Sequence, residues 1–298
     1  MTDNKIQRFL FKELNIRGQV IQLNDAWQLM IKDRHYPPVI SKLLGELTAF
    51  SVIMATGMKH TGKVTLQIQG SGPITLLLVE VTHDLKIRGL AKTNQTIKNE
   101  ATLDELLGDG QIVVTLENTQ TNRHFQSYVE RTGDNIIKVC ESFLTQSEQQ
   151  PSKLWLAATD TALGGVLIQK MPDSDNQDKD GWNRIYNITT TVKEEELTDL
   201  DSETLLHRLF HEEEVGLFEA QEVRYECPQD KSRVDQMLIS LGEEEVRKVL
   251  KEQGEIVIHN EICNVHLRYG ETEVNALFKN AIHSLIDFLL NKGEVIKI

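Results

Sequence analysis

The sequence predicts an α+β fold with an N-terminal domain of mixed sheet and helix, a helical acidic linker and a small C-terminal α+β module. Two patterns support this prediction. Residues 63–69 alternate polar and apolar side chains with a period of two, which is typical of a half-buried strand. Residues 39–54 are an apolar-faced stretch with helical spacing. A chain of 298 residues, 40% of them hydrophobic, can bury one large core and a smaller one.

The N-terminal domain is predicted to cover residues 1–172. It begins with a helix-like pattern and changes to a strand pattern at residues 18–23. Asn24 is expected to cap a helical segment, which Pro37-Pro38 separates from the helix ending near Met54. Further strands are predicted at residues 63–69, 74–81, 85–93, 111–116, 123–128, 153–156 and 162–169, and a helix with Cys140 on its apolar side at residues 135–149.

Two segments of different character follow. Residues 173–222 are predicted to be a linker, in which a polar loop up to residue 183 precedes an acidic and amphipathic helical region. Residues 223–298 are predicted to form the C-terminal module. Its expected elements are a strand at residues 222–227, helices at 232–241 and 243–252, a hairpin at 255–269 and a final helix at 273–291.

The composition predicts a cytoplasmic protein. A formal net charge of −13 argues against a nucleic-acid partner, because phosphate binding needs an excess of Lys and Arg. We find no signal-peptide pattern and no stretch approaching the ~18 apolar residues of a membrane span, so we expect no membrane partner. Three cysteines are too few for a secreted disulfide framework.

No catalytic constellation is visible, and we expect that the protein is not an enzyme. Residues 57–64 approximate a phosphate-binding loop, but Val64 stands where a magnesium-binding Ser or Thr is required, and a strand follows instead of a helix. This segment is interpreted as a turn. Residues 70–73 are interpreted as a turn that needs positive φ, and Gly164-Gly165 as a bulge or a close backbone approach.

The acidic linker allows two interpretations. Its Glu triplets, at residues 194–196 and 212–214, are most simply a solvated helix face. Alternatively, repulsion within the triplets leaves the segment marginally stable, so that stress unfolds it and exposes apolar side chains. The candidates for binding other proteins are then Leu205, Leu206, Leu209 and Phe210.

Cys227 and Cys263 are the residues most suggestive of a regulatory site. With His259 and His266 they offer a Cys₂His₂ donor set for zinc. However, on a continuous strand His259 and Cys263 share one face and His266 points away, so we consider zinc doubtful. A Cys227–Cys263 disulfide would contribute ~3–4 kcal/mol by closing the loop between them, but in a reducing cytosol it needs oxidative stress. Two free thiols packed in a small core are the expected resting state of the pair.

An ordered set of segments resembles the 33 kDa chaperonins, a family of redox-regulated heat-shock holdases, over nearly the whole chain. The segments that carry the resemblance are residues 9–11 with 16–18, residues 64–73, residues 88–89, residues 147–151, residues 164–172 and residues 209–215. The resemblance implies an N-terminal α+β domain, a metastable helical linker and a C-terminal redox switch. It also implies binding of unfolding proteins without ATP, and dimers in the active form.

This chain departs from the family at the switch. The resemblance implies a C-x-C and a C-x-x-C motif that bind zinc until an oxidant converts them to disulfides. Gln229 stands at the missing cysteine of the first motif, after Cys227, and Asn260 at that of the second, before Cys263. Amide side chains are poor zinc ligands, so a four-thiolate site is impossible and no cofactor is expected.

The hypothesis that follows is an ATP-independent holdase that binds unfolded or partly folded client proteins under stress. Heat would act through the fragile linker, with at most a weakened thiol response. The first alternative keeps partial redox control through a Cys227–Cys263 disulfide or a Cys/His zinc site. The second is a protein-interaction module without chaperoning. A homodimer is possible in each case.

Overall fold

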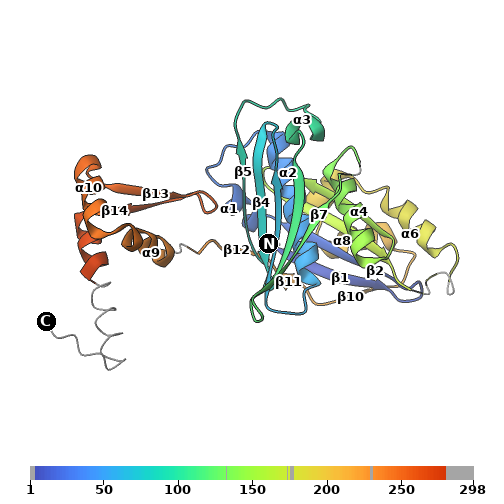
Figure 1. Cartoon of the computed structure of the whole chain (residues 1–298). Helices are drawn as coiled ribbons and strands as arrows, with labels where there is room; N and C mark the ends of the chain where they lie inside the picture. The colour runs from blue at the N-terminus through green and yellow to red at the C-terminus, as the bar shows by residue number, and fades with distance from the viewer. Residues whose placement is uncertain (1–3, 132, 173, 175–177, 229–230, 280–298) are drawn as a thin grey trace, which may run out of the picture. The chain divides into compact units, whose positions relative to one another are not determined.

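The computed structural model describes residues 4–131, 133–172, 174, 178–228 and 231–279. The chain divides into two compact units, Met1–Cys227 and Pro228–Ile298, called here the body and the C-terminal unit (Figure 1). Residues 178–222 of the predicted linker belong to the body, where they form helices and short strands.

Two six-stranded sheets form the body. Sheet A contains β1 (Lys5–Phe11), β2 (Ile16–Leu23), β8 (Ser152–Ala158), β9 (Leu163–Lys170), β10 (Val215–Leu217) and β11 (Gln221–Glu222). Sheet B contains β3 (Gly62–Gln69), β4 (Ile74–Thr82), β5 (Lys86–Thr93), β6 (Gln111–Asn118), β7 (Arg123–Val129) and β12 (Arg224–Tyr225). Their orders are β10-β1-β2-β9-β8, with β11 also beside β1, and β12-β5-β4-β3-β6-β7. All strands pair antiparallel except β12 with β5.

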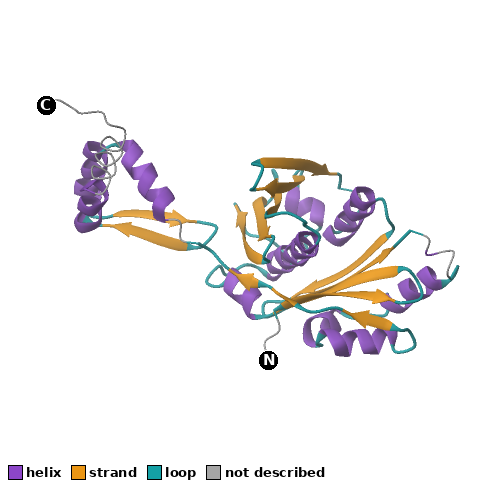
Figure 2. Ribbon diagram, turned by 90° about the horizontal axis from the view of Figure 1, so that it is seen from below, coloured by secondary structure: helices purple, strands orange, loops and turns teal. Residues whose placement is uncertain are grey.

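The body is layered. Helix α2 (Pro38–Thr56) contacts strands of both sheets and lies between them, with α1 (Asp25–Ile31) and α4 (Ile136–Glu148) contributing to the same apolar cluster (Figure 2). The opposite face of sheet A is covered by α6 (Gly181–Thr189), α7 (Glu194–Asp199) and α8 (Ser202–Phe210), which enclose a second apolar cluster. Alternate residues of β1, β2 and β9 supply the two clusters, as a pleated strand requires. Sheet A is therefore buried on both faces.

Helix α2 corrects the expectation that no stretch of the chain approaches a membrane span. Among the described residues, this helix has the length and mean hydropathy of such a span. Yet 83% of that window is buried inside the body, so α2 is a core helix. Its buried Thr48, Ser51 and Thr56 hydroxyls each donate to the carbonyl four residues earlier, at 2.7, 2.7 and 2.8 Å, which satisfies polar groups that burial would otherwise penalise.

The expected helical start of the chain is wrong. Residues 5–11 form β1, which pairs with β2 along its whole length. The apolar spacing of this segment fits a helix, but tertiary pairing overrides local propensity. Gly18 on β2 permits the arrangement, because a Cβ there would lie 2.1 Å from the ring of Phe9.

Most other predicted elements of the body are confirmed within a few residues. Asn24 precedes α1 but makes no side-chain cap, since the Asn4 Oδ1 instead accepts from the backbone N–H groups of Asn24 and Ala26. The turn at residues 70–73 does not use positive φ. Its glycines are required by close approach to helix α3 (Leu103–Leu107), since a Cβ on Gly70 would lie 2.3 Å from the Leu107 carbonyl oxygen.

The C-terminal unit has its own small core. It comprises α9 (Lys231–Leu241), α10 (Glu243–Gln253), β13 (Ile256–Asn260), β14 (Val265–Tyr269) and a helix at residues 271–279. The remainder of the predicted final helix lies outside the described residues, as do residues 173 and 175–177 of the predicted polar loop. Its apolar cluster consists of Leu238, Val246, Ile256, Tyr269, Val274, Leu277 and Phe278.

Candidate functional site

The docked helices α6–α8 bury the apolar side chains that the sequence proposed for binding other proteins. Leu205, Leu206, Leu209 and Phe210 are between 0 and 5% exposed. The ring of Phe210 lies 4.9 Å from that of Phe11, measured between centroids, in an edge-to-face arrangement. In this state of the molecule these side chains are covered, and they become available only if the helices leave sheet A.

Gly164 marks the closest contact between the docked helices and sheet A. A Cβ at this position of β9 would lie 1.8 Å from the carbonyl oxygen of Leu197 in α7. The predicted close backbone approach is thus confirmed, while the register of β9 with β2 runs through Gly164 without a bulge. Any side chain at this position would have to push α7 away from the sheet.

Ion pairs at the margin of the docked helices are partly exposed. Lys42 on α2 contacts Glu194 on α7, with the Nζ 2.7 Å from a carboxylate oxygen. The Arg184 guanidinium on α6 lies 2.7 Å from Glu213, which follows α8. Exposed pairs of this kind contribute about 1 kcal/mol or less each. The docking therefore depends mainly on apolar burial.

A buried carboxyl lies close to the ion pair of Lys42 and Glu194. Glu46 on α2 is 6% exposed. Burial raises the pKa of Glu46 to about 7, with a smaller contribution in the same direction from the charge of Glu194, while the Lys42 charge opposes the shift. Burial, with Glu46 nearby, also raises the pKa of the Cys140 thiol on α4, so this cysteine is held as an unreactive thiol.

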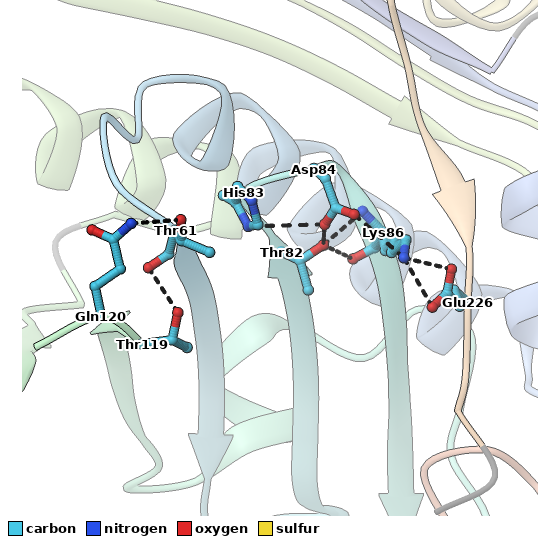
Figure 3. A network of polar contacts seen from close by, with 8 residues as sticks. All are labelled: Thr61, Thr82, His83, Asp84, Lys86, Thr119, Gln120 and Glu226. Atoms are coloured by element: carbon cyan, nitrogen blue, oxygen red, sulfur yellow. Dashed lines mark hydrogen bonds and ion pairs between the residues drawn. The ribbon is translucent and has the colours of Figure 1, made fainter. Parts of the chain in front are cut away.

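Cys227 ends a segment that is anchored to sheet B. The preceding residue, Glu226, donates its backbone N–H to the Ile87 carbonyl oxygen at 3.2 Å. Its carboxylate lies 2.8 Å from the Lys86 Nζ, which also contacts Asp84 at 3.3 Å (Figure 3). β12 and this network therefore fix the position of the chain immediately before the cysteine.

Cys263 lies in the turn between β13 and β14 and is 6% exposed. Its backbone N–H donates to the side-chain oxygen of Asn260 at 3.3 Å, and its Sγ lies 3.9 Å from the carbonyl oxygen of Pro228. Cys227 and Cys263 are at disulfide-bonding distance, whereas Cys140 is a free cysteine. This structure therefore has the disulfide alternative for Cys227 and Cys263, and not the free thiols expected for the resting state.

The donors do not fit the zinc site that the family resemblance implies. The predicted strand geometry was wrong, because β13 ends at Asn260 and the turn places His259 directly opposite His266. The two imidazole rings stack at 4.4 Å and are exposed, while Cys263 is buried. Asn260 is engaged in the turn, and Gln229 lies outside the described residues. No group of three or more His, Cys, Asp or Glu in the described part of the chain could hold a metal.

Comparisons with known proteins agree with this architecture. The family model described as Hsp33 protein matches residues 4–270. The chain belongs to the Hsp33 family. Among curated proteins, the chain is 39% identical to the 33 kDa chaperonin of Chromobacterium violaceum over 277 residues, covering 92% of this chain and 94% of that protein. It is 37% identical to the 33 kDa chaperonin of Methylobacillus flagellatus over 279 residues, covering 93% and 95%.

A solved structure supports the fold of this Hsp33-family chain. The crystal structure of the 33 kDa chaperonin (heat shock protein 33 homolog) of Thermotoga maritima superposes with a TM-score of 0.77. The match covers 94% of this chain and all of that chain, at 17% sequence identity. At this identity the likeness supports the shared fold alone.

Sequence reasoning missed several residues of the site. Phe9 and Phe11 line the surface of sheet A that α8 covers, and their i, i+2 spacing was the signal for a strand face. Glu46 is a second case, since a lone acid in the apolar stretch of α2 marked a buried carboxyl. The contact between Gly164 and Leu197 could be anticipated from the sequence only through the pair Gly164-Gly165, which does not indicate the partner.

Proposed function

We propose that this chain is an ATP-independent holdase, a stress chaperone that binds unfolding proteins and prevents their aggregation. The observation that carries the proposal is the apolar face of sheet A, which, among the described residues, is covered by the short helices α6–α8. α7 has six residues and α8 nine, lengths at which a helix has little stability of its own. The cover is therefore held by tertiary contacts, and stress that weakens them uncovers a large apolar surface.

If α6–α8 left sheet A, apolar side chains would be exposed both on the sheet and on the helices. The body contributes Phe9, Phe11 and Ile168, which would be left on an open sheet, and the detached helices carry Leu209 and Phe210. Each such side chain contributes roughly 1.5–3 kcal/mol when it is removed from water. Unfolding proteins expose apolar segments that can bury this surface again, so capture needs no nucleotide.

The thiol response is proposed to be reduced to one disulfide. Oxidation of Cys227 and Cys263 closes a loop containing most of the described C-terminal unit, in place of the two adjacent disulfides that the family resemblance implied. No zinc is proposed, because the donors present do not suit it. Heat acting on the docked helices is then the principal activating signal, and oxidation a secondary one.

Other parts of the proposal concern location and partners. The protein is proposed to act in the cytoplasm, without enzymatic activity and without nucleic-acid or membrane partners, consistent with its net charge of −13. A homodimer remains a proposal, to be tested by sedimentation velocity of the reduced and heated protein.

The test measures light scattering of a thermally unfolding client protein with the reduced full-length chain. We expect suppression at raised temperature, and suppression at lower temperature by Gly164→Ala, whose methyl group displaces α7 from sheet A. Gly216→Ala is the matched control, since the nearest atom to its added Cβ is 3.7 Å away. Aggregation that proceeds unchanged with a several-fold excess of the chain would refute the proposal and leave a fixed-partner interaction module as the alternative.

A further inference from the structure

Strand β7 is an open edge of sheet B. It pairs with β6 on one side and is the last strand in the order of the sheet (Figure 1). Six of its seven residues are exposed, and the seventh, Val129, is partly buried. Its outer backbone N–H and C=O groups face away from β6, as in any edge strand.

The other edges of the body's sheets are protected. β8, at the edge of sheet A, is mostly buried and contacts α2, α4 and α7. The opposite margins end in β10, β11 and β12, which have only two or three residues each. Within the described part of the body, β7 is the one long edge strand left uncovered.

β7 also lacks the usual devices that prevent edge pairing. Its register with β6 is regular over seven residue pairs, and it contains no proline. Arg123 and His124, the side chains of β7 that can carry a positive charge, stand together at its beginning. Residues 125–129 are uncharged, so the strand can accept a neighbouring strand without placing a charge in the contact.

Exposed aromatic side chains lie on both faces of this edge. Phe125 and Tyr128 are each 69% exposed, and their odd spacing places them on opposite faces of the strand. Phe125 stands opposite Leu116, and Tyr128 opposite Val113. An added strand would therefore meet an aromatic contact on either face.

The Tyr128 face opens into a shallow hollow. Its lining includes the amide side chains of Gln67, Gln111 and Gln126, together with the carboxylate of Asp109. Such amides both donate and accept hydrogen bonds, so they can accommodate different neighbouring side chains. An edge of this kind does not require an added strand to have one particular sequence or to pair in one particular register.

We propose that the β7 edge binds an extended apolar segment of an unfolding client protein by strand addition, independently of the surface under α6–α8. Backbone hydrogen bonds would supply affinity without sequence preference, with Phe125 and Tyr128 packing on alternate side chains of the client. A second copy of this chain is the less suitable occupant, because two chains that each carry a net charge of −13 repel each other. The inference rests on the proposed holdase function and adds a second capture surface to it.

The experiment compares two double variants of the full-length chain in the aggregation assay. Phe125→Lys with Tyr128→Lys places charge on both faces of the edge. Leu29→Lys with Leu241→Lys is the control, since these side chains are 50% and 58% exposed elsewhere and the net charge changes equally. We expect the edge variant to need a several-fold higher ratio of chaperone to client than the wild type, and the control to match the wild type. Equal thermal midpoints, within about 2 °C, establish that both variants are folded.

Photo-crosslinking identifies the occupant. Benzoylphenylalanine in place of Phe125 is expected to crosslink to an unfolding client under activating conditions. A crosslink to a second copy instead, or an edge variant as active as the control, overturns the inference. Failure of the wild type itself to suppress aggregation would count against the proposed function, so the two failures are distinguishable.

Discussion

The body and the C-terminal unit are stabilised in different ways. The body buries two apolar clusters on the two faces of sheet A, and its described cysteine outside the disulfide pair, Cys140, is a free thiol within the larger cluster. The apolar cluster of the C-terminal unit has seven buried residues among those described. A disulfide between Cys227 and Cys263 closes the first part of this unit into a loop. A core of that size contributes little net stability after chain entropy is subtracted. We therefore expect redox state to act on the C-terminal unit rather than on the body.

Within the body the same contrast recurs between the two clusters. The larger cluster lies between the two sheets, and it combines residues of their strands with the long helix α2 and with α1 and α4. The smaller one is closed by α6–α8, which contribute much of its buried surface. A region closed by short helices opens at a lower free-energy cost than one closed by a sheet. We therefore expect the docked helices to be the part of the body most sensitive to stress.

The largest expected effect comes from removing an anchor of the docked helices. Phe210→Ala should lower the free energy of unfolding of the docked region by about 3–5 kcal/mol, because it removes a buried ring and leaves a cavity. Hydrogen exchange of α6–α8 and binding of an apolar dye measure the effect. Phe218→Ala is the matched control, since that ring is 56% exposed, and it should change stability by about 0.5 kcal/mol or less. Equal exchange in both variants would contradict the assignment.

Reduction of the cysteine pair should affect the C-terminal unit alone. Opening the loop between Cys227 and Cys263 is expected to cost the unit about 3–4 kcal/mol. Calorimetry with and without reductant should show the thermal transition of that unit shifting downward while the body's transition stays in place. Cys227→Ser should reproduce the shift and abolish the response to reductant. A response that persists in this variant would exclude the pair as its source.

The buried Glu46 should make the stability of the body depend on pH. Its folded-state pKa of about 7 exceeds the ordinary value of 4.5 for a glutamate, so the folded state binds more protons between these two pH values. Stability contributed by the protonated carboxyl is complete below about pH 4.5 and is lost as pH rises through 7, by about 3 kcal/mol in all. Glu46→Gln should flatten this part of the pH profile, measured by denaturant unfolding. A slope unchanged in the variant would assign the dependence to another group.

The smallest effect is expected at the margin of the docked helices. Arg184→Met removes the contact with Glu213 and should cost about 1 kcal/mol or less, because the guanidinium is 37% exposed and screened by solvent. Raising the salt concentration should reduce the stability of the wild type toward that of the variant. A loss comparable with that of Phe210→Ala would mean that charge, rather than apolar burial, holds the helices in place.

Local patterns in the sequence determined much of the fold. The alternation of residues 63–69 and the apolar run that follows predicted β3 and β4, because a half-buried strand must alternate and a central strand need not. The proline pair before α2 predicted where that helix begins. The count of three cysteines excluded a four-thiolate site before any geometry was known.

Tertiary structure decided what no local pattern could. Residues 5–11 became a strand because β2 lies beside them, and His259 came to face His266 because a turn intervenes at residues 261–264. The linker's apolar side chains are buried rather than displayed, because sheet A has a second apolar face, which α6–α8 cover in the described part of the chain. Local sequence reports the conformation that each segment can adopt. Which surfaces meet depends on contacts between residues far apart in the chain, and their free energy is gained only when the fold is complete.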